Sequence, residues 1–395
     1  MIPPSAPIPP RRLKIALVCD WFLPRVGGLE MHMRDLALGL IRHGHEVHVV
    51  TPTPGGDRVE GIPVHRLNIR LFPYYGFICT REGFLEMESV LKRGEFDLIH
   101  CHGSVIAPAA YGGAYLGQKL GIAAVVTCHS ILKYFKPVLT VLNRRFKWAR
   151  WPVQFSAVSE AAAAYVRPFL GGKPVHILPN GLDPAEWRVT PISRDPHEIV
   201  IVSVMRLNIR KRPRALVSLI PFILEHLPPG MRLKVRIIGE GPERKGLQAM
   251  LSRLSLGDTV ELLGNKSRKE IREIFAGADM MVLPTVHESF GLSVLEARCA
   301  GLPVVAMQRS GVSEIIHHGQ EGLLAASDQD MADQMLRLIA DRELRSSIAR
   351  HNRETSPGYD WDKVISLHEK LYFQAIAMRQ HSPRSGATRG EYQKP

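Results

Sequence analysis

Short apolar runs alternate with amphipathic stretches of ten or more residues along most of this 395-residue chain. The first unit pairs an apolar run at 13–19 with a helical pattern at 29–44, and a second apolar run follows at 45–50. Crossover helices cover both faces of a parallel sheet, so its strands become nearly continuous apolar runs. The alternation therefore predicts an α/β fold built on parallel sheets.

The alternation is interrupted once, by a segment at 179–198 that is rich in Pro, Gly and Asp. Further apolar runs lie on both sides of it, at 97–102, 122–128, 153–158, 175–179, 199–204, 233–238, 259–263, 279–284 and 302–307. Two domains are the expectation for a chain of this length. We expect two Rossmann-like domains that face a cleft, at 13–182 and 198–358, joined by a linker at 183–197.

The end of the chain carries one more amphipathic pattern, at 360–377. We expect a helix at 359–378 that crosses back to the N-terminal domain. The segments 1–12 and 379–395 lack a periodic apolar pattern, and we expect both to be disordered tails.

Composition narrows the class of protein. Apolar residues make up 45% and charged residues 23%, as in an ordinary soluble protein. The formal net charge of +13 favours anionic partners. The five cysteines are scattered without metal-binding spacing, which favours reduced thiols in a cytosolic protein. The first residues are rich in proline and no window of 18 apolar residues occurs, so we expect neither a signal peptide nor a membrane span.

Gly27 and Gly28 lie between the first predicted strand and its helix. Paired glycines allow a ligand to approach the backbone and leave the first N–H groups of the helix free for a phosphate. A full G-x-G-x-x-G pattern is absent, and Thr51 ends the second predicted strand in place of an acid, so a dinucleotide fingerprint is not indicated. A tight turn without a ligand is the alternative.

Basic residues follow the first strand of the second half, at Arg206, Arg210, Lys211 and Arg212. Ligands of open α/β sheets bind at the carboxyl ends of strands, and guanidinium and ammonium groups hold phosphate oxygens. A solvated basic loop is the alternative. A glycine-rich turn at 239–242 follows the next strand and leaves room for a base or a ribose.

Two acids flank a Phe-Gly-Leu-Ser turn, Glu288 and Glu296. We expect a helix that begins near Phe290 or Gly291, whose N–H groups would favour a negative oxygen. Glu296, one to two turns into that helix, can accept two hydroxyl hydrogen bonds from a ribose, and Glu288 can accept those of a sugar. Two surface glutamates without a ligand are the alternative.

In this order and spacing, these motifs resemble those of the retaining family-4 glycosyltransferases, which have the two-domain GT-B architecture. The resemblance extends from Lys14 to about Ala377. The motifs that carry it are GG at 27–28, HCH at 100–102, TCHS at 127–130, PNGLD at 179–183, Arg206 with Lys211, GEGP at 239–242, and the acids of 288–296.

The resemblance implies that the C-terminal domain holds a nucleotide-diphosphate sugar. Arg206 and Lys211 would contact the diphosphate and Glu296 the ribose, while the amide of Gly28 would reach the β-phosphate from the other domain. Glu288 and the backbone at 290–292 would hold the sugar. The implied catalytic residues are His129, Arg206, Lys211 and Glu288. The implied donor-binding residues are Gly28, Arg206, Lys211, Gly239, Glu288, Phe290, Gly291, Leu292 and Glu296.

The chemistry of the implied reaction requires no metal. Charge builds on the β-phosphate as the sugar leaves, and cationic side chains and helix N–H groups stabilise it. Two Asp-x-Asp strings, at 328–330 and 360–362, precede amphipathic patterns, and we interpret them as helix caps. We therefore expect neither a metal nor a cofactor. Ser310 stands where many family members have glycine, which would narrow the loop near the sugar.

The stretch at 131–155 interleaves basic and aromatic residues, as a helix on an anionic membrane does. A core-facing helix with a solvated charged side is the alternative. We assign five residues to the acceptor or membrane side: His102, Arg144, Arg145, Lys147 and Trp148.

The resemblance is strongest to phosphatidylinositol-directed N-acetylglucosaminyl and mannosyltransferases. We expect an acceptor glycan, glycolipid or polyol, foremost a lipid-linked one at the cytosolic membrane face, for a cytoplasmic or peripheral enzyme. A glycosyltransferase with a soluble or polysaccharide acceptor and a nucleotide-sugar 2-epimerase are the alternatives. We find no nucleic-acid-binding module and expect no nucleic-acid partner.

Overall fold

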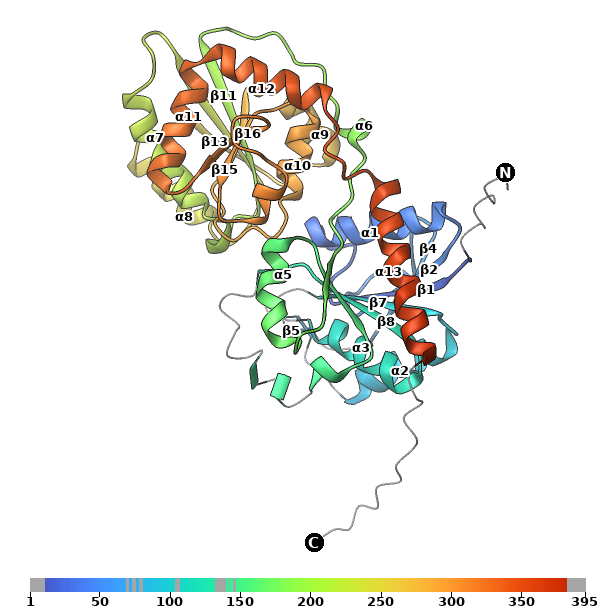
Figure 1. Ribbon diagram of the computed structural model, residues 1–395. Coiled ribbons are helices and arrows are strands. Elements are labelled where there is room, and N and C mark those ends of the chain that lie inside the picture. Colours follow the sequence, from blue (N-terminus) through green and yellow to red (C-terminus); the bar gives the residue numbers. More distant parts are fainter. Residues whose placement is uncertain are drawn as a thin grey trace, which may run out of the picture.

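Two α/β domains, each with a parallel sheet covered by helices, make up the molecule (Figure 1). This is the architecture that the alternating pattern predicted. The computed structural model describes residues 11–68, 71–72, 76–77, 81–103, 107–131, 140–141, 143–144 and 147–381.

The N-terminal sheet has eight strands in the order β10-β9-β8-β7-β1-β2-β4-β3, parallel except for the β3–β4 pair. Its strands are β1 (Lys14–Cys19), β2 (Glu46–Thr51), β3 (Arg58–Val59), β4 (Ile62–Arg66), β7 (Leu98–Gly103), β8 (Ala123–Cys128), β9 (Gln154–Ala157) and β10 (Val175–Ile177). A separate two-stranded pair joins β5 (Leu71–Phe72) and β6 (Gly76–Phe77). Strand β1 lies inside the sheet, with β2 to β4 on one side of it and β7 to β10 on the other.

The C-terminal sheet has six parallel strands in the order β13-β12-β11-β14-β15-β16. They are β11 (Glu198–Val204), β12 (Arg232–Ile238), β13 (Val260–Gly264), β14 (Met280–Leu283), β15 (Val304–Met307) and β16 (Gly322–Ala325). The apolar pattern located all of them except β16, whose four residues begin with glycine. It also missed β4 and the two-residue strands β3, β5 and β6; β4 contains Pro63 and its residues are only partly apolar.

Helices connect the strands of both sheets. They are α1 (Gly28–Arg42), α2 (Arg81–Arg93), α3 (Pro108–Leu120), α5 (Glu160–Val166), α6 (Pro184–Trp187), α7 (Pro213–Glu225), α8 (Arg244–Arg253), α9 (Arg268–Ala276), α10 (Leu292–Cys299), α11 (Asp328–Ala340), α12 (Arg342–Glu354) and α13 (Trp361–His381). Asp360 caps α13 through the Lys363 amide (3.2 Å), as predicted, whereas Ser327 caps α11. No helix within the described ranges is long and apolar enough to span a membrane.

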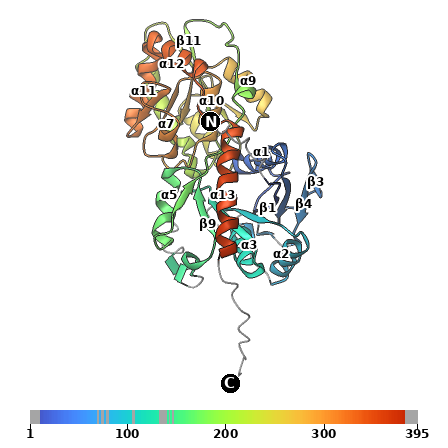
Figure 2. The same ribbon diagram turned by 45° about the vertical axis from the view of Figure 1, so that its right-hand side comes forward.

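Helix α13 crosses back to the N-terminal domain and lies along its sheet (Figure 2). Ile365 and Tyr372 are fully buried there, and Ile365 packs so closely on α1 that a Cβ at Gly39 would lie 3.1 Å from its Cδ1. The two chain crossings between the domains run side by side, because Leu182 donates a backbone hydrogen bond to Tyr359 (2.9 Å). The helix continues to His381, three residues beyond the end at 378 that we expected.

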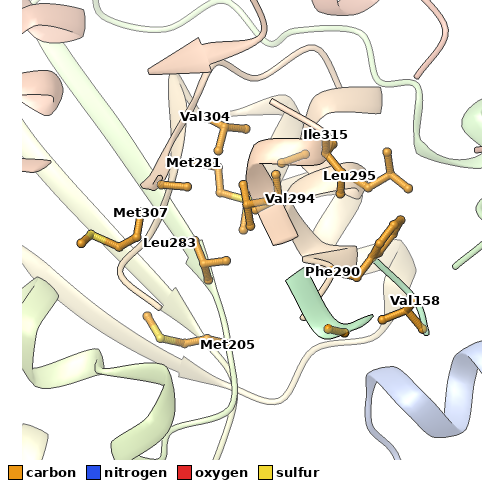
Figure 3. Close-up of a cluster of buried hydrophobic side chains, with 14 of the residues drawn as sticks. Val158, Met205, Met281, Leu283, Phe290, Val294, Leu295, Val304, Met307 and Ile315 are labelled. Atoms are coloured by element: carbon orange, nitrogen blue, oxygen red, sulfur yellow. The ribbon is translucent and has the colours of Figure 1, made fainter. Parts of the chain in front are cut away.

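The domains also share an apolar contact near the start of α10. Phe290 is buried and lies beside Val158, which comes from the N-terminal domain (Figure 3). The same ring meets that of Tyr359 edge to face at 5.3 Å. The core of the C-terminal domain therefore continues into one side of the N-terminal domain.

Hydrogen bonds reinforce this contact. The hydroxyl of Ser289 accepts a bond from the Ile131 amide (3.1 Å), and the hydroxyl of Ser159 donates to the Ser289 carbonyl. The carboxylate of Glu314 accepts bonds from the Glu160 and Ala161 amides (both 3.0 Å). One domain thus satisfies the N-terminus of α5 in the other.

Candidate active site

The strand order of each sheet places one crevice at its carboxyl edge. In doubly wound sheets this crevice lies where the chain reverses its direction of growth, and it is where ligands bind. The reversal falls between β11 and β14 in the C-terminal sheet and between β1 and β7 in the N-terminal sheet. Lys211 and Glu288 follow β11 and β14, and Gly28 and His129 follow β1 and β8. The predicted residues therefore gather at the two carboxyl edges.

Lys211 and Glu288 form an ion pair between their Nζ and Oε2 atoms. Their backbones are fixed as well: the Lys211 amide bonds the Asn208 side chain (3.0 Å), and the Glu288 carbonyl accepts a bond from Gly311 (2.8 Å). Both side chains are largely buried, at 31% and 12% exposure. A cation and an acceptor carboxylate thus stand together at the crevice.

Arg206 is exposed, and a guanidinium from the other domain lies within its electrostatic reach. Arg25 stacks on the Trp21 ring at 3.8 Å and pairs with Glu30 (3.2 Å). Burial lowers the pKa of Arg25, Glu30 opposes that effect, and the positive charge of Arg206 lowers the pKa further. Two like charges held near each other favour an anion between them.

Arg25 was not among the residues that the sequence indicated. The signal was available, because the residue follows β1 and stands two positions before Gly27, at the carboxyl edge where ligands bind.

Gly28 begins α1 and has open space around it. A Cβ at this position would meet no atom within 4 Å, and no side chain caps the N-terminus of this 15-residue helix. The protein's own packing therefore does not require a glycine here. The Glu30 carboxylate lies beside Gly27, but no side chain accepts a capping hydrogen bond there, and uncapped N–H groups can hold a phosphate oxygen.

Gly239 is explained by packing instead. Its φ is +130°, and a Cβ would lie 2.0 Å from the Met205 carbonyl oxygen. Its amide already donates to Gly264 (2.8 Å). The glycine lets the ends of β11 and β12 approach each other, so its presence alone does not indicate a donor contact.

In the turn before α10, the backbone and not the side chains is placed to bind a ligand. Gly291 adopts a φ of +94° and precedes Leu292, the first residue of the helix, while the Phe290 ring is buried in the interface. Ser310 does not narrow this region as we expected. It is buried, donates to the Met307 carbonyl (2.9 Å) and accepts from Val312 (3.3 Å), so its side chain faces its own turn.

Glu296 lies in a separate charged cluster. It is 9% exposed, and burial raises its pKa to about 8, opposed by Arg268 and supported by Glu186 and Asp35. Arg268 pairs with Asp35 of the other domain and lies 3.6 Å from Glu186. The acid thus faces an interdomain arginine, which no motif had indicated.

An interdomain cavity of about 410 Å³ adjoins this cluster. Its lining includes Asp35 from α1, Glu186 from α6, and Arg268 and Leu292 from the C-terminal domain, but not Lys211 or Glu288. The candidate site therefore has two parts. A cationic part lies at the crevice, and a part with several carboxylates lies nearer the domain connections.

His129 is partly buried and neutral. Its backbone amide donates to Gly103 (2.8 Å), and its Nε2 lies 2.9 Å from Nδ1 of His102. Burial lowers its pKa to about 3, helped by His368. His102 is itself 1% exposed, so it supports His129 and does not form part of a surface for an acceptor or a membrane.

The basic–aromatic stretch turns its aromatic side inward where the structure describes it. Trp148 is buried beside the Tyr111 ring (4.9 Å), which corrects its assignment to a membrane surface. Arg144 and Lys147 are exposed. Arg145, like most of 132–146, lies outside the described residues. Of the two interpretations, the described residues favour a core-facing aromatic side with solvated charges.

Among the described residues, no group of three or more His, Cys, Asp or Glu side chains is arranged to hold a metal ion. Among the described residues, the positive charges that could pair with a bound anion at the candidate site belong to arginine and lysine side chains.

Two family models match the chain, one for each domain. The model described as "Glycosyltransferase Family 4" matches residues 26–186, and "Glycosyl transferases group 1" matches 190–355. Together they include Gly28, His129, Lys211 and Glu288.

Curated relatives cover nearly the whole chain. The phosphatidylinositol N-acetylglucosaminyltransferase gpi3 subunit of Schizosaccharomyces pombe is 25% identical, over 90% of this chain and 79% of its own length. The Bacillus anthracis N-acetyl-alpha-D-glucosaminyl L-malate synthase is 24% identical, over 92% of this chain and 98% of its own. Among solved structures, Anabaena HepE in complex with UDP-glucose has a TM-score of 0.73 at 20% identity, over 93% of this chain and all of HepE, and shows the same fold.

The contrast between two glycines generates a test. We expect Gly28→Ala to leave the melting temperature unchanged or slightly higher, because alanine favours a helix by up to about 1 kcal/mol. The same change should weaken nucleotide-sugar binding. Gly239→Ala should lower the free energy of unfolding by about 2 kcal/mol or more through strain and overlap. Thermal unfolding with and without nucleotide sugar measures both stability and binding. A normal affinity in Gly28→Ala would contradict a phosphate site at the N-terminus of α1.

Proposed function

We propose that this chain, which belongs to the family-4 glycosyltransferases, transfers N-acetylglucosamine from a UDP-linked donor to an acceptor hydroxyl with retention of configuration and without a metal. The family transfers sugars from nucleotide sugars, and the chain is a glycosyltransferase. The donor sugar, the stereochemistry and the acceptor are the proposal.

The observation that carries the proposal is the meeting of cations from both domains at the facing crevices. Arg206 and Lys211 come from the C-terminal domain, and Arg25 comes from the N-terminal domain together with the open N-terminus of α1. A leaving nucleoside diphosphate gains negative charge at its β-phosphate in the transition state. Preorganised cations and N–H groups at that point lower the barrier.

Two relatives with different acceptors support N-acetylglucosamine as the sugar. One is named for phosphatidylinositol and the other for malate, yet both names specify the transfer of N-acetylglucosamine. A GDP-linked mannose is the competing donor from the sequence resemblance. Glu296 would hold the ribose in either case, and Glu288 with the backbone of 290–292 would hold the sugar.

The basicity of the departing phosphate supports a reaction that retains the configuration of the sugar. A departing phosphate is itself basic enough to accept the proton of the acceptor hydroxyl on the face that it leaves, so no enzyme base is required there. A neutral His129 suits a hydrogen-bonding role beside the sugar better than that of a proton-accepting base, since its pKa lies near 3. In this proposal the cations replace a metal.

For the acceptor we propose a hydroxyl of a lipid-linked inositol at the cytosolic membrane face, as the phosphatidylinositol-directed relatives suggest. The malate-directed relative supports a second candidate, a small soluble hydroxy acid. Because Trp148 is buried, it supplies no aromatic anchor for a membrane at that position.

A panel of UDP- and GDP-linked sugars tests the donor. A ligand that binds only the native state raises the melting temperature. We expect UDP-N-acetylglucosamine to raise it most, and GDP-mannose to have little effect. Product analysis by proton NMR should then show an α-linked sugar. A larger shift with GDP-mannose would replace the proposed donor.

Lys211→Ala should lower kcat by about 10²-fold, because one preorganised charge at the leaving group is lost. Lys234→Ala is the matched control. Lys234 lies near the amino end of β12, at the opposite edge of the same sheet, and bonds only the Asp258 carbonyl among the described residues. Steady-state rates at saturating donor decide the matter, and near-normal turnover in Lys211→Ala would exclude its leaving-group role.

Glu296 makes donor binding depend on pH. Its pKa of about 8 means that the free enzyme holds it protonated at neutral pH. Two ribose hydroxyls donate to a carboxylate and would favour its ionised form, so binding should release a proton. We expect affinity for the nucleotide sugar to rise between pH 6 and 8, by up to about tenfold per pH unit, and to level off above.

Isothermal titration in buffers of different ionisation heats measures this release. The nucleotide sugar is the right probe, since its diphosphate does not titrate in this range. Glu296→Gln should bind more weakly at pH 8 and lose the pH dependence. A pH-independent affinity in the unaltered enzyme would show that Glu296 does not accept the ribose hydroxyls.

A further inference from the structure

Five histidines gather beneath the N-terminal crevice. They are His32, His100, His102, His129 and His368. Burial lowers the pKa of every one, so the cluster is neutral at physiological pH. Among the described residues, none of them belongs to a metal-binding group. A neutral imidazole has one N–H and one lone pair, so its tautomer decides what it offers to a ligand.

The hydrogen bonds of His102 select its tautomer. Its Nδ1 lies 2.9 Å from Nε2 of His129, while its Nε2 is buried and has no hydrogen-bond partner in the described part of the chain. If Nε2 carried the proton, an N–H group would be buried without an acceptor, which is rarer in proteins than an unused lone pair. The proton therefore belongs on Nδ1, which donates to His129.

This assignment fixes His129 in turn. Its Nε2 accepts the bond from His102, so its proton must be on Nδ1. That atom makes no hydrogen bond with the described residues, and the side chain is only partly buried. The Nδ1–H is thus left available at the carboxyl end of β8, the edge that faces the candidate donor site.

We propose that His102 is a positioning residue, whose buried Nδ1–H holds His129 in the one tautomer that presents an N–H donor to an oxygen of the transferred sugar. The inference rests on the proposed function, which places that sugar beside His129. It adds that His129 acts only as a donor, and that a residue without contact to the substrate sets this role.

Nitrogen-15 NMR of histidine-labelled enzyme tests the tautomers directly. Long-range proton–nitrogen correlations distinguish a protonated ring nitrogen from an unprotonated one. We expect His129 and His102 to be protonated at Nδ1 and unprotonated at Nε2, with the His129→Leu spectrum as the assignment control. Protonation of His129 at Nε2 would overturn the proposal. The tautomers are read from the unaltered enzyme, and this measurement needs no donor.

Kinetics test the consequence. We expect His102→Leu to lower kcat/KM for the donor sugar about tenfold, the effect of one lost hydrogen bond, with UDP affinity unchanged. His102→Asn keeps an N–H near the Nδ1 position and should stay within about threefold of the unaltered enzyme. In a His129→Leu background, His102→Leu should have no further effect.

His45→Leu is the control for general destabilisation. His45 is equally buried and bonds the Leu13 amide (3.1 Å) and Glu369 (3.0 Å), but it lies at the amino edge of the sheet. The His45→Leu variant should have a lower melting temperature and an unchanged kcat/KM. Additive losses from His102 and His129, or an equal loss of UDP affinity, would make His102 merely structural. If the chain bound no nucleotide sugar at all, the proposed function would fail while the NMR result would stand.

Discussion

Contacts within the protein itself, and not a bound ligand, hold the positive charges of the two domains in place. Arg25 is fixed by the Trp21 ring and Glu30, and Lys211 by its backbone bond to Asn208 and its ion pair with Glu288. Arg206, from the C-terminal domain, lowers the pKa of Arg25 through its positive charge, and an anion bound between these two guanidinium groups would relieve that repulsion. The strand orders, the open N-terminus of α1 and the apolar contact at Phe290 all serve this one arrangement.

Much of this arrangement follows from the sequence. Parallel strands place everything at their carboxyl ends on one edge, so locating the apolar runs was enough to group Lys211 with Glu288 and Gly28 with His129. The predicted elements agree with the structure because buried parallel strands and amphipathic helices leave strong periodic signals. The missed strands are short, and one contains proline.

What could not be predicted depends on contacts between segments far apart in sequence. No periodicity relates Arg268 to Asp35, which come from different domains, or orients the Ser310 hydroxyl toward its own turn. The same holds for Trp148, whose aromatic and basic neighbours fit a membrane surface as well as a core. Two glycines that look alike in sequence, Gly28 and Gly239, differ because only the second has a carbonyl oxygen against it.

Ser289 links the sugar-side loop to domain motion. It follows Glu288 directly, and its hydroxyl and carbonyl both bond the N-terminal domain, while Glu314 satisfies the first amides of α5 from across the boundary. If the domains separate to exchange products, these interdomain hydrogen bonds must break together, and their polar groups must then bond to water. The order of this loop and the separation of the two domains are then coupled. Residues that do not contact the nucleotide therefore set how long the two domains stay together.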